Sequence, residues 1–90
     1  MIKLLDVEYK IENGNENINE EELKSFFTDY FKDFDYVLGD YAYDKLRLKG
    51  FYDSDSSSVK EYNNIKKVDN YIKNYCAYGA KTFLLKKVNK

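Results

Sequence analysis

Near the start of the chain, apolar and polar residues alternate. Apolar residues occupy every second position of the segment 5–11, and charged residues fill the positions between them. Because successive side chains of a strand point to opposite faces, this pattern predicts a strand with one buried face. The polar sequence Asn13-Gly14-Asn15 is typical of a turn, so we expect the strand to end there.

The next segment has the periodicity of a helix. Asn19 precedes three glutamates and is a candidate N-cap, with Glu22 as its capping-box partner. The pattern predicts a helix over about residues 20–33. Its buried face is formed by apolar residues at spacings of three and four, namely Leu23, Phe26, Phe27, Tyr30 and Phe31.

Three more strands are expected, over about residues 35–41, 45–52 and 82–88. The connection between the first two of these is short, Tyr41-Ala42-Tyr43-Asp44. Two strands joined by so few residues form an antiparallel hairpin, because a parallel pair needs a much longer crossover.

A second helix is expected between the hairpin and the last strand. Its start has two candidates: Ser58 with Glu61 would form a capping box, and Asn63 or Asn64 could also cap it. We favour the later start, because the preceding residues carry little apolar periodicity. Gly79 is well placed to end the helix. The apolar face consists of Ile65, Val68, Ile72, Tyr75 and Cys76.

The expected order of elements is therefore β-α-β-β-α-β. This is an α+β fold of the ferredoxin-like order, in which two helices pack on one face of a mostly antiparallel four-stranded sheet. Residues 1–90 form a single domain, since a chain of this length supports one core. In this order the first strand lies beside the third.

Two stretches of the chain resemble the YutD-like family, which comprises small cytoplasmic proteins of low-GC Gram-positive bacteria. The first is GDYAYDKLRLKGF over residues 39–51, and the second is YCAYG over 75–79 followed by the strand TFLLK over 82–86. In that family Tyr41 often corresponds to Trp and Ala80 to Cys, so this chain departs from the pattern at both positions. The resemblance implies a fold and a compartment, but no activity.

Composition excludes several kinds of site. The chain has no histidine, which removes the residue most used as a general base and as a zinc ligand. One cysteine, Cys76, allows no internal disulfide. Neither a signal peptide nor a membrane-length apolar run is visible. We therefore expect a cytoplasmic protein without cofactor or metal.

Charge is unevenly distributed along the chain. Residues 1–59 carry seven Lys or Arg and fourteen Asp or Glu, whereas residues 60–90 carry eight Lys and two acids. A basic segment with interleaved aromatic residues can follow a nucleic-acid backbone. Alternatively, acidic and basic elements lie side by side in the fold and cancel; we favour this interpretation. The basic segment includes Lys60, Lys66, Lys67, Lys73, Lys86, Lys87 and Lys90, with Tyr62, Tyr71 and Tyr78 among them.

The hairpin carries the candidate binding residues. Strand parity places its leucines on one face, toward the helices, and Arg47, Lys49 and Phe51 on the other. We expect Tyr41, beside the space that Gly39 leaves above the sheet, to supply the contact together with them, and the lysine-rich second helix to assist. Sheets of this topology bind RNA on exposed aromatic residues, so RNA, a ribonucleoprotein or an acidic protein surface is the expected partner.

Alternative interpretations of the same residues remain. Because the first strand lies beside the third in this order, Asp6 and Glu8 would lie near Arg47 and Lys49 and neutralise them; we favour this interpretation. Asp40, Tyr43 and Arg47 could serve a small enzyme; alternatively, as we favour, Asp40 satisfies turn amides and Arg47 clamps the connection. We expect a non-enzymatic binding module, and the alternative is a protein–protein interaction adaptor with a tyrosine-rich surface or an open sheet edge.

Overall fold

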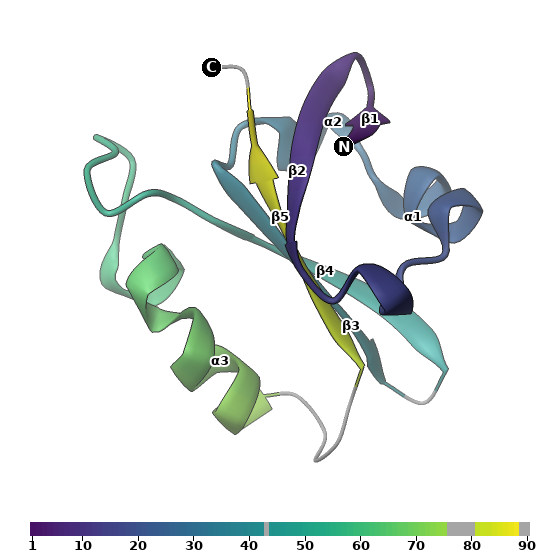
Figure 1. Cartoon of the computed structure of the whole chain (residues 1–90). Helices are drawn as coiled ribbons and strands as arrows, with labels where there is room; N and C mark the ends of the chain where they lie inside the picture. Colours follow the sequence, from purple (N-terminus) through teal and green to yellow (C-terminus); the bar gives the residue numbers. More distant parts are fainter. Residues whose placement is uncertain (43, 76–80, 89–90) are drawn as a thin grey trace.

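A five-stranded antiparallel sheet forms the centre of the molecule (Figure 1). The computed structural model describes residues 1–42, 44–75 and 81–88. Every pair of neighbouring strands is antiparallel. In spatial order the strands are β1 (Ile2–Leu4), β2 (Val7–Asn13), β5 (Thr82–Lys87), β3 (Tyr36–Ala42) and β4 (Lys45–Phe51).

The N-terminal segment forms a hairpin and not the single strand expected over 5–11. Leu5 and Asp6 have left-handed φ angles of 50° and 67° and connect β1 to β2. A two-residue turn with positive φ at both positions matches the twist of the strands that it joins. The alternation of apolar and polar residues continues through the turn, and neither Gly nor Asn marks it.

The first helix is shorter than expected, and the prediction of one continuous helix over residues 20–33 was wrong. Two helices occupy this region, α1 (Glu20–Phe26) and α2 (Asp29–Lys32), because Phe27 and Thr28 have extended backbones. The break directs the Phe27 ring into the core, where it meets Tyr9 edge-on at 5.4 Å between centroids. The predicted N-cap is confirmed: Asn19 Oδ1 accepts a hydrogen bond from the Glu22 N–H at 3.2 Å.

The later start of the second helix is also confirmed. The helix α3 (Val68–Tyr75) follows the 3₁₀ turn η3 (Ile65–Lys67), and Asn64 Oδ1 accepts from the Lys66 N–H at 2.9 Å. Cys76 and Gly79, the expected end of this helix, lie outside the described residues. Two further 3₁₀ turns are η1 (Asn15–Asn17) and η2 (Glu61–Asn63).

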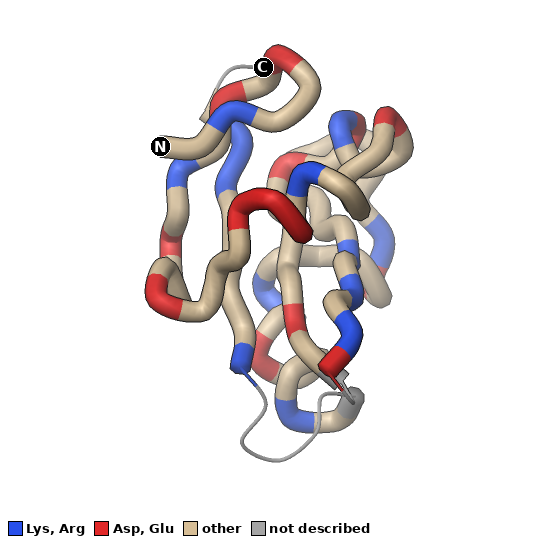
Figure 2. Tube along the Cα trace, turned by 90° about the vertical axis from the view of Figure 1, so that its right-hand side faces the viewer, with Lys and Arg blue, Asp and Glu red and all other residues tan. Residues whose placement is uncertain are grey.

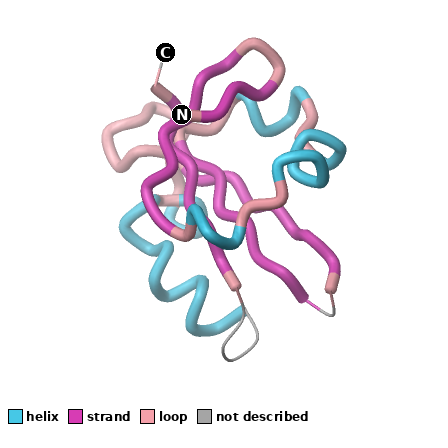
Figure 3. The backbone as a smooth tube through the Cα atoms, turned by 45° about the vertical axis from the view of Figure 1, so that its right-hand side comes forward, coloured by secondary structure: helices cyan, strands magenta, loops and turns pink. Residues whose placement is uncertain are grey.

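The helices lie on opposite faces of the sheet, so the expectation of two helices on one face was wrong (Figures 1 and 3). On one face, Leu23 of α1 and Phe27 join the main core. On the other, Tyr71 of α3 meets Phe51 of β4 edge-on, with 5.6 Å between ring centroids. The main core contains Ile2, Leu4, Tyr9, Leu23, Phe27, Val37, Leu46, Phe83 and Leu85.

The sheet also differs from the expected ferredoxin-like order. It has five strands in place of four, and β5 lies between β2 and β3. β2 therefore does not neighbour β4, and the expected approach of Asp6 and Glu8 to Arg47 and Lys49 does not occur. A central strand needs apolar residues on both faces. β5 meets this requirement, since Phe83 and Leu85 are buried on one face and Leu84 is half-buried on the other.

Two glycines of the hairpin admit aromatic rings. A Cβ atom at Gly39 would lie 2.1 Å from Phe83 Cζ, and one at Gly50 would lie 2.2 Å from Phe34 Cγ. The space that the sequence predicted above Gly39 is thus filled by a core side chain.

Candidate functional site

The predicted binding residues of β4 begin with Arg47, which is paired inside the sheet. Arg47 Nη2 lies 2.6 Å from Asp40 Oδ2 on the directly opposite position of β3. The Asp40 residue is only 2% exposed, whereas the Arg47 side chain is 46% exposed. A short charge-assisted bond to a buried carboxylate fixes the guanidinium. The pair therefore joins β3 and β4, which agrees with the structural role that we favoured for Arg47, but Asp40 binds this guanidinium in place of the expected turn amides.

Phe51 is fully buried beneath α3, so the expectation that it faces solvent was wrong. Its neighbour Lys49 is half-buried on the same face. The Lys49 ammonium lies 5.9 Å from the centroid of the Phe51 ring and 5.7 Å from that of Tyr62. Both distances allow cation–π attraction.

Tyr41 lies on the opposite face of the sheet, where it packs against the main core. Partial burial raises the pKa of its hydroxyl, and the Glu22 carboxylate raises it further by its charge and by accepting a hydrogen bond. A hydrogen bond with the Asn19 backbone acts in the other direction. Tyr43 is outside the described residues. The predicted residues therefore do not form one continuous surface.

A different set of side chains gathers around Lys49 in what we call the aromatic–lysine cleft. The cleft has a volume of about 290 Å³ and lies between α2, the end of β4 and η2. Four aromatic rings and two lysines line it: Tyr30, Phe34, Tyr52, Tyr62, Lys49 and Lys60.

Three of the four aromatic rings of the cleft are in contact. Ring centroids are 5.3 Å apart between Tyr30 and Phe34, and 4.7 Å apart between Phe34 and Tyr52. Phe34 is buried, whereas Tyr30 and Tyr62 are each 66% exposed. The cleft thus presents two large accessible rings on a packed aromatic base.

The backbone around the cleft is held by Tyr52 and Asn63. The Tyr52 N–H donates to the Asn63 carbonyl at 2.7 Å, and the Ile65 N–H donates to the Tyr52 carbonyl at 2.9 Å. The buried Asn63 side chain accepts from the Lys60 N–H at 2.6 Å. These bonds fix η2, and with it Tyr62, against the end of the sheet. The sequence marked Asn63 only as a possible helix cap.

The charge around the cleft is mixed. Burial raises the pKa of the Tyr52 hydroxyl, and the carboxylates of Asp33 and Asp35 raise it further. Asp35 also lines a neighbouring hollow with Asp53, whose N–H donates to Asp35 Oδ2 at 2.9 Å. The cleft therefore carries two ammonium groups, Lys49 and Lys60, and has carboxylates close to its Tyr52 hydroxyl.

The charge asymmetry along the sequence is largely mixed in space. β5, from the basic C-terminal part, lies between β2 and β3 of the acidic part. Figure 2 shows basic and acidic residues on adjacent segments over much of this view. This agrees with the interpretation that we favoured. Within the described ranges, no group of three or more Asp, Glu, His or Cys residues could hold a metal ion. No described helix has the length and apolarity of a membrane span.

Comparison with known proteins gives one consistent result. Residues 4–86 match the YutD-like family, described as "Putative antitoxin YutD-like". The chain is 35% identical to a "Putative antitoxin YutD" of Bacillus subtilis strain 168, over the full length of both. It is also similar to the solution NMR structure of protein yutD from B. subtilis, with a TM-score of 0.80 and 34% identity; all of this chain and 83% of that chain are covered.

Proposed function

Because the chain belongs to the YutD-like family, we propose that it is a non-enzymatic binding module that holds a protein partner, as the word antitoxin in the family description suggests. In this proposal the partner is a toxin protein, and the aromatic–lysine cleft is the contact surface. The protein–protein alternative from the sequence thus becomes the leading candidate.

The exposure of Tyr30 and Tyr62 in a cleft that is also lined by Lys49 is the observation that supports this proposal. Both rings are 66% exposed, although they contact other aromatic side chains or Lys49. Tyrosine is enriched among the residues that dominate binding energy at protein interfaces. Its ring supplies a large apolar area, and its hydroxyl remains hydrogen-bonded at the edge.

The base of the cleft supports the same conclusion. Phe34 and Tyr52 pack behind the exposed rings, and the backbone bonds of Asn63 hold η2 in place. A surface that is already ordered loses less conformational entropy on binding. Lys49 and Lys60 would select a partner with carboxylates next to its apolar contact residues.

The test compares two variants of the tagged chain. Tyr30→Ala combined with Tyr62→Ala removes the accessible rings, and Phe26→Ala is the matched control, an exposed aromatic residue that does not line the cleft. Partners retained from a native lysate are identified, purified and measured by calorimetry. We expect the double variant to bind about 30-fold more weakly or worse, and the control to bind as the wild type does.

The antitoxin role is tested by co-expression. A partner that is a toxin should arrest growth when produced alone, and the wild-type chain should relieve the arrest. The double variant should not relieve it, although it accumulates to the same level. Equal affinity and equal relief by both chains would contradict the assignment of the cleft.

RNA is the second candidate partner, and the exposed lysines of η3 and α3 are the observation that favours it. Lys66, Lys67 and Lys73 are all exposed there, and the exposed Tyr62 ring lies just before them. This proposal predicts retention of RNA at low salt and a steep fall in affinity as salt rises. Replacing the three lysines by glutamine should then weaken RNA binding. Filter binding that shows no retention at low salt would exclude it.

A further inference from the structure

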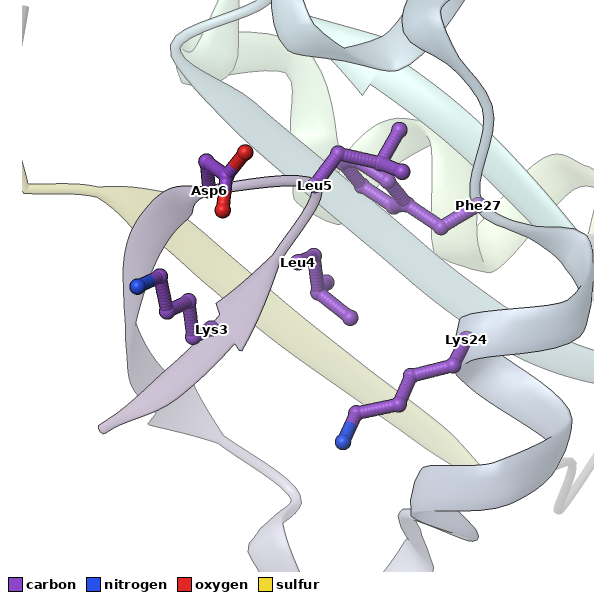
Figure 4. A pocket seen from close by; sticks show the side chains of 6 residues that line it. All are labelled: Lys3, Leu4, Leu5, Asp6, Lys24 and Phe27. Carbon is purple, nitrogen blue, oxygen red and sulfur yellow. The ribbon is translucent and has the colours of Figure 1, made fainter.

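A groove beside α1 carries a second inference. It lies between the edge of β1 and α1 and has a volume of about 600 Å³ (Figure 4). Leu4 and Phe27 form its buried floor, being 2% and 4% exposed. Leu5, Lys3, Asp6 and Lys24 form its rim.

β1 is an edge strand of the sheet, and one of its residues offers unpaired backbone groups. Lys3 is opposite Glu8 on β2. The Glu8 carbonyl accepts from the Val88 N–H at 3.0 Å, on the side away from β1. In an antiparallel pair both groups of a residue point to the same side, so Lys3 and Glu8 form a non-hydrogen-bonded pair. The Lys3 N–H and C=O therefore face the free edge.

The turn beside this edge holds an apolar side chain in an unfavourable backbone conformation. Leu5 has a φ of 50°, which is unfavourable for a residue with a Cβ atom, and the residue is 44% exposed. Figure 4 shows the Leu5 side chain on the same side as Phe27, and both residues line the groove. Strained residues that persist at a surface are a reason to look for function there.

The charged groups of the rim suit an acidic ligand. Lys3 and Lys24 supply two ammonium groups, and Asp6 is the one carboxylate of the lining. Lys24 pairs with Glu20 at 3.7 Å, and Lys3 lies opposite the Glu8 carboxylate on β2, but all four side chains are exposed, and such pairs are weak.

We propose that this groove binds an extended peptide segment of a protein partner, added beside β1 as a further strand. The Lys3 backbone supplies the two hydrogen bonds, and an apolar side chain of the segment rests on Leu4 and Phe27. Carboxylates of the segment face Lys3 and Lys24, so the ligand alternates apolar and acidic residues. This mode of binding takes its affinity from main-chain bonds and its specificity from alternate side chains.

A short edge strand with a lysine also discourages unwanted sheet pairing. That role accounts for Lys3, but it does not account for an exposed leucine in the left-handed turn. The groove is separate from the aromatic–lysine cleft, so it adds a second contact surface to the proposed module.

The test uses a short capped peptide of alternating leucine and glutamate as the probe, measured by fluorescence anisotropy. A peptide with lysine in place of glutamate should bind at least about tenfold more weakly. N-methylation of the central residue, which removes one main-chain donor, should also reduce binding. Amide NMR shifts of the chain should concentrate at Lys3, Leu4, Leu5 and Phe27.

Variants separate binding from folding. Leu5→Asn suits the left-handed turn better than leucine, so it should preserve or raise stability while it weakens peptide binding. Lys3→Gln combined with Lys24→Gln should weaken binding about tenfold. Lys10→Gln, an exposed lysine of β2 that does not line the groove, is the matched control and should bind as the wild type does.

Several outcomes would overturn the proposal. Equal binding of the glutamate and lysine peptides would show that the charges of the groove do not select the ligand. Undiminished binding to Leu5→Asn would show that the Leu5 side chain does not contribute to binding. If sedimentation showed a dimer that the peptide dissociates, the occupant would be a second copy of the chain. The Tyr30→Ala, Tyr62→Ala variant should still bind the peptide. A result that contradicts peptide binding in the groove can therefore be told apart from one that contradicts partner binding at the aromatic–lysine cleft.

Discussion

At the scale of single residues, close packing against Gly39 is the most exacting feature of the core. The Phe83 ring occupies the space of a side chain at residue 39, since a Cβ atom there would lie 2.1 Å from Phe83 Cζ. Phe83 lies directly opposite Gly39 in the sheet, and its ring can lie across β3 on the core face only because residue 39 has no side chain. The glycine thus sets the position of a central core ring.

Gly39→Ala should therefore destabilise the protein by about 1–3 kcal/mol, because overpacking forces the ring or the backbone to move. The measurement is urea unfolding followed by circular dichroism. Phe83→Leu shortens the opposing side chain and provides the control. If the double variant is no more stable than the sum of the single effects predicts, the contact is not the cause.

The Tyr9 hydroxyl is the second residue-scale feature. Tyr9 is fully buried, and its oxygen has no hydrogen-bond partner among the described residues. Burial raises the pKa of this hydroxyl from 10.0 to about 12. A buried polar group without a partner reduces stability, so Tyr9→Phe should leave the free energy of unfolding unchanged or raise it by about 1 kcal/mol.

The raised pKa also predicts a pH dependence. Between pH 10.0 and about 12, Tyr9 keeps its proton in the folded chain but loses it in the unfolded chain. Ionisation of Tyr9 therefore leaves the free energy of unfolding of the wild type unchanged below pH 10 and lowers it as the pH rises from 10 toward 12. The difference in unfolding free energy between Tyr9→Phe and the wild type should grow over this range. A constant difference would contradict the assignment.

At the scale of elements, local sequence signals predicted those structures that depend on near neighbours. The hairpin of β3 and β4 and the N-cap Asn19 follow from turn length and capping chemistry, and both are present. The turn at Leu5 and Asp6 carries no glycine or asparagine signal, so the pattern predicted one strand in place of the first hairpin. The predicted helix is interrupted at Phe27, where burial of the ring against Tyr9 accompanies an extended backbone despite the helical periodicity of the sequence.

Asn19→Ala should test how much α1 depends on its cap. Loss of the Asn19 side-chain bond to the Glu22 N–H should cost about 1 kcal/mol. Asn19→Ser keeps an oxygen that can accept this bond and should recover most of the loss. Thermal unfolding of the two variants provides the measurement, and equal destabilisation by serine and alanine would show that the bond is not the source.

The candidate site also depends on how elements pack together, which local sequence patterns do not predict. Lys49 was predicted from strand parity and does line the cleft. Tyr30 was assigned to the buried face of a continuous helix, but the break after Phe26 leaves it 66% exposed. Tyr62 was noted only as one aromatic residue among lysines. The cleft depends on how α2 and η2 meet at the end of β4, which no local pattern specifies.

At the scale of the whole molecule, the order of strands decides which surfaces are open. Strand parity correctly separated the two faces of β4, but it could not say that α3 would cover the second face. Leu38 and Phe51, 1% and 0% exposed, belong to that face and give it an apolar centre of its own. The sheet therefore buries residues on both sides, and the sequence alone suggested only one.

Substitution of Phe51 tests this layering directly. Because its ring is fully buried and contacts Tyr71, Phe51→Ala should destabilise the protein by about 3–5 kcal/mol. Tyr62→Ala removes an aromatic ring of similar size that is 66% exposed, so its cost should stay below about 1 kcal/mol. Unfolding of both variants in urea makes the comparison. A small effect at Phe51 would mean that α3 does not seal this face, and the ring would again be available to a ligand on the open sheet.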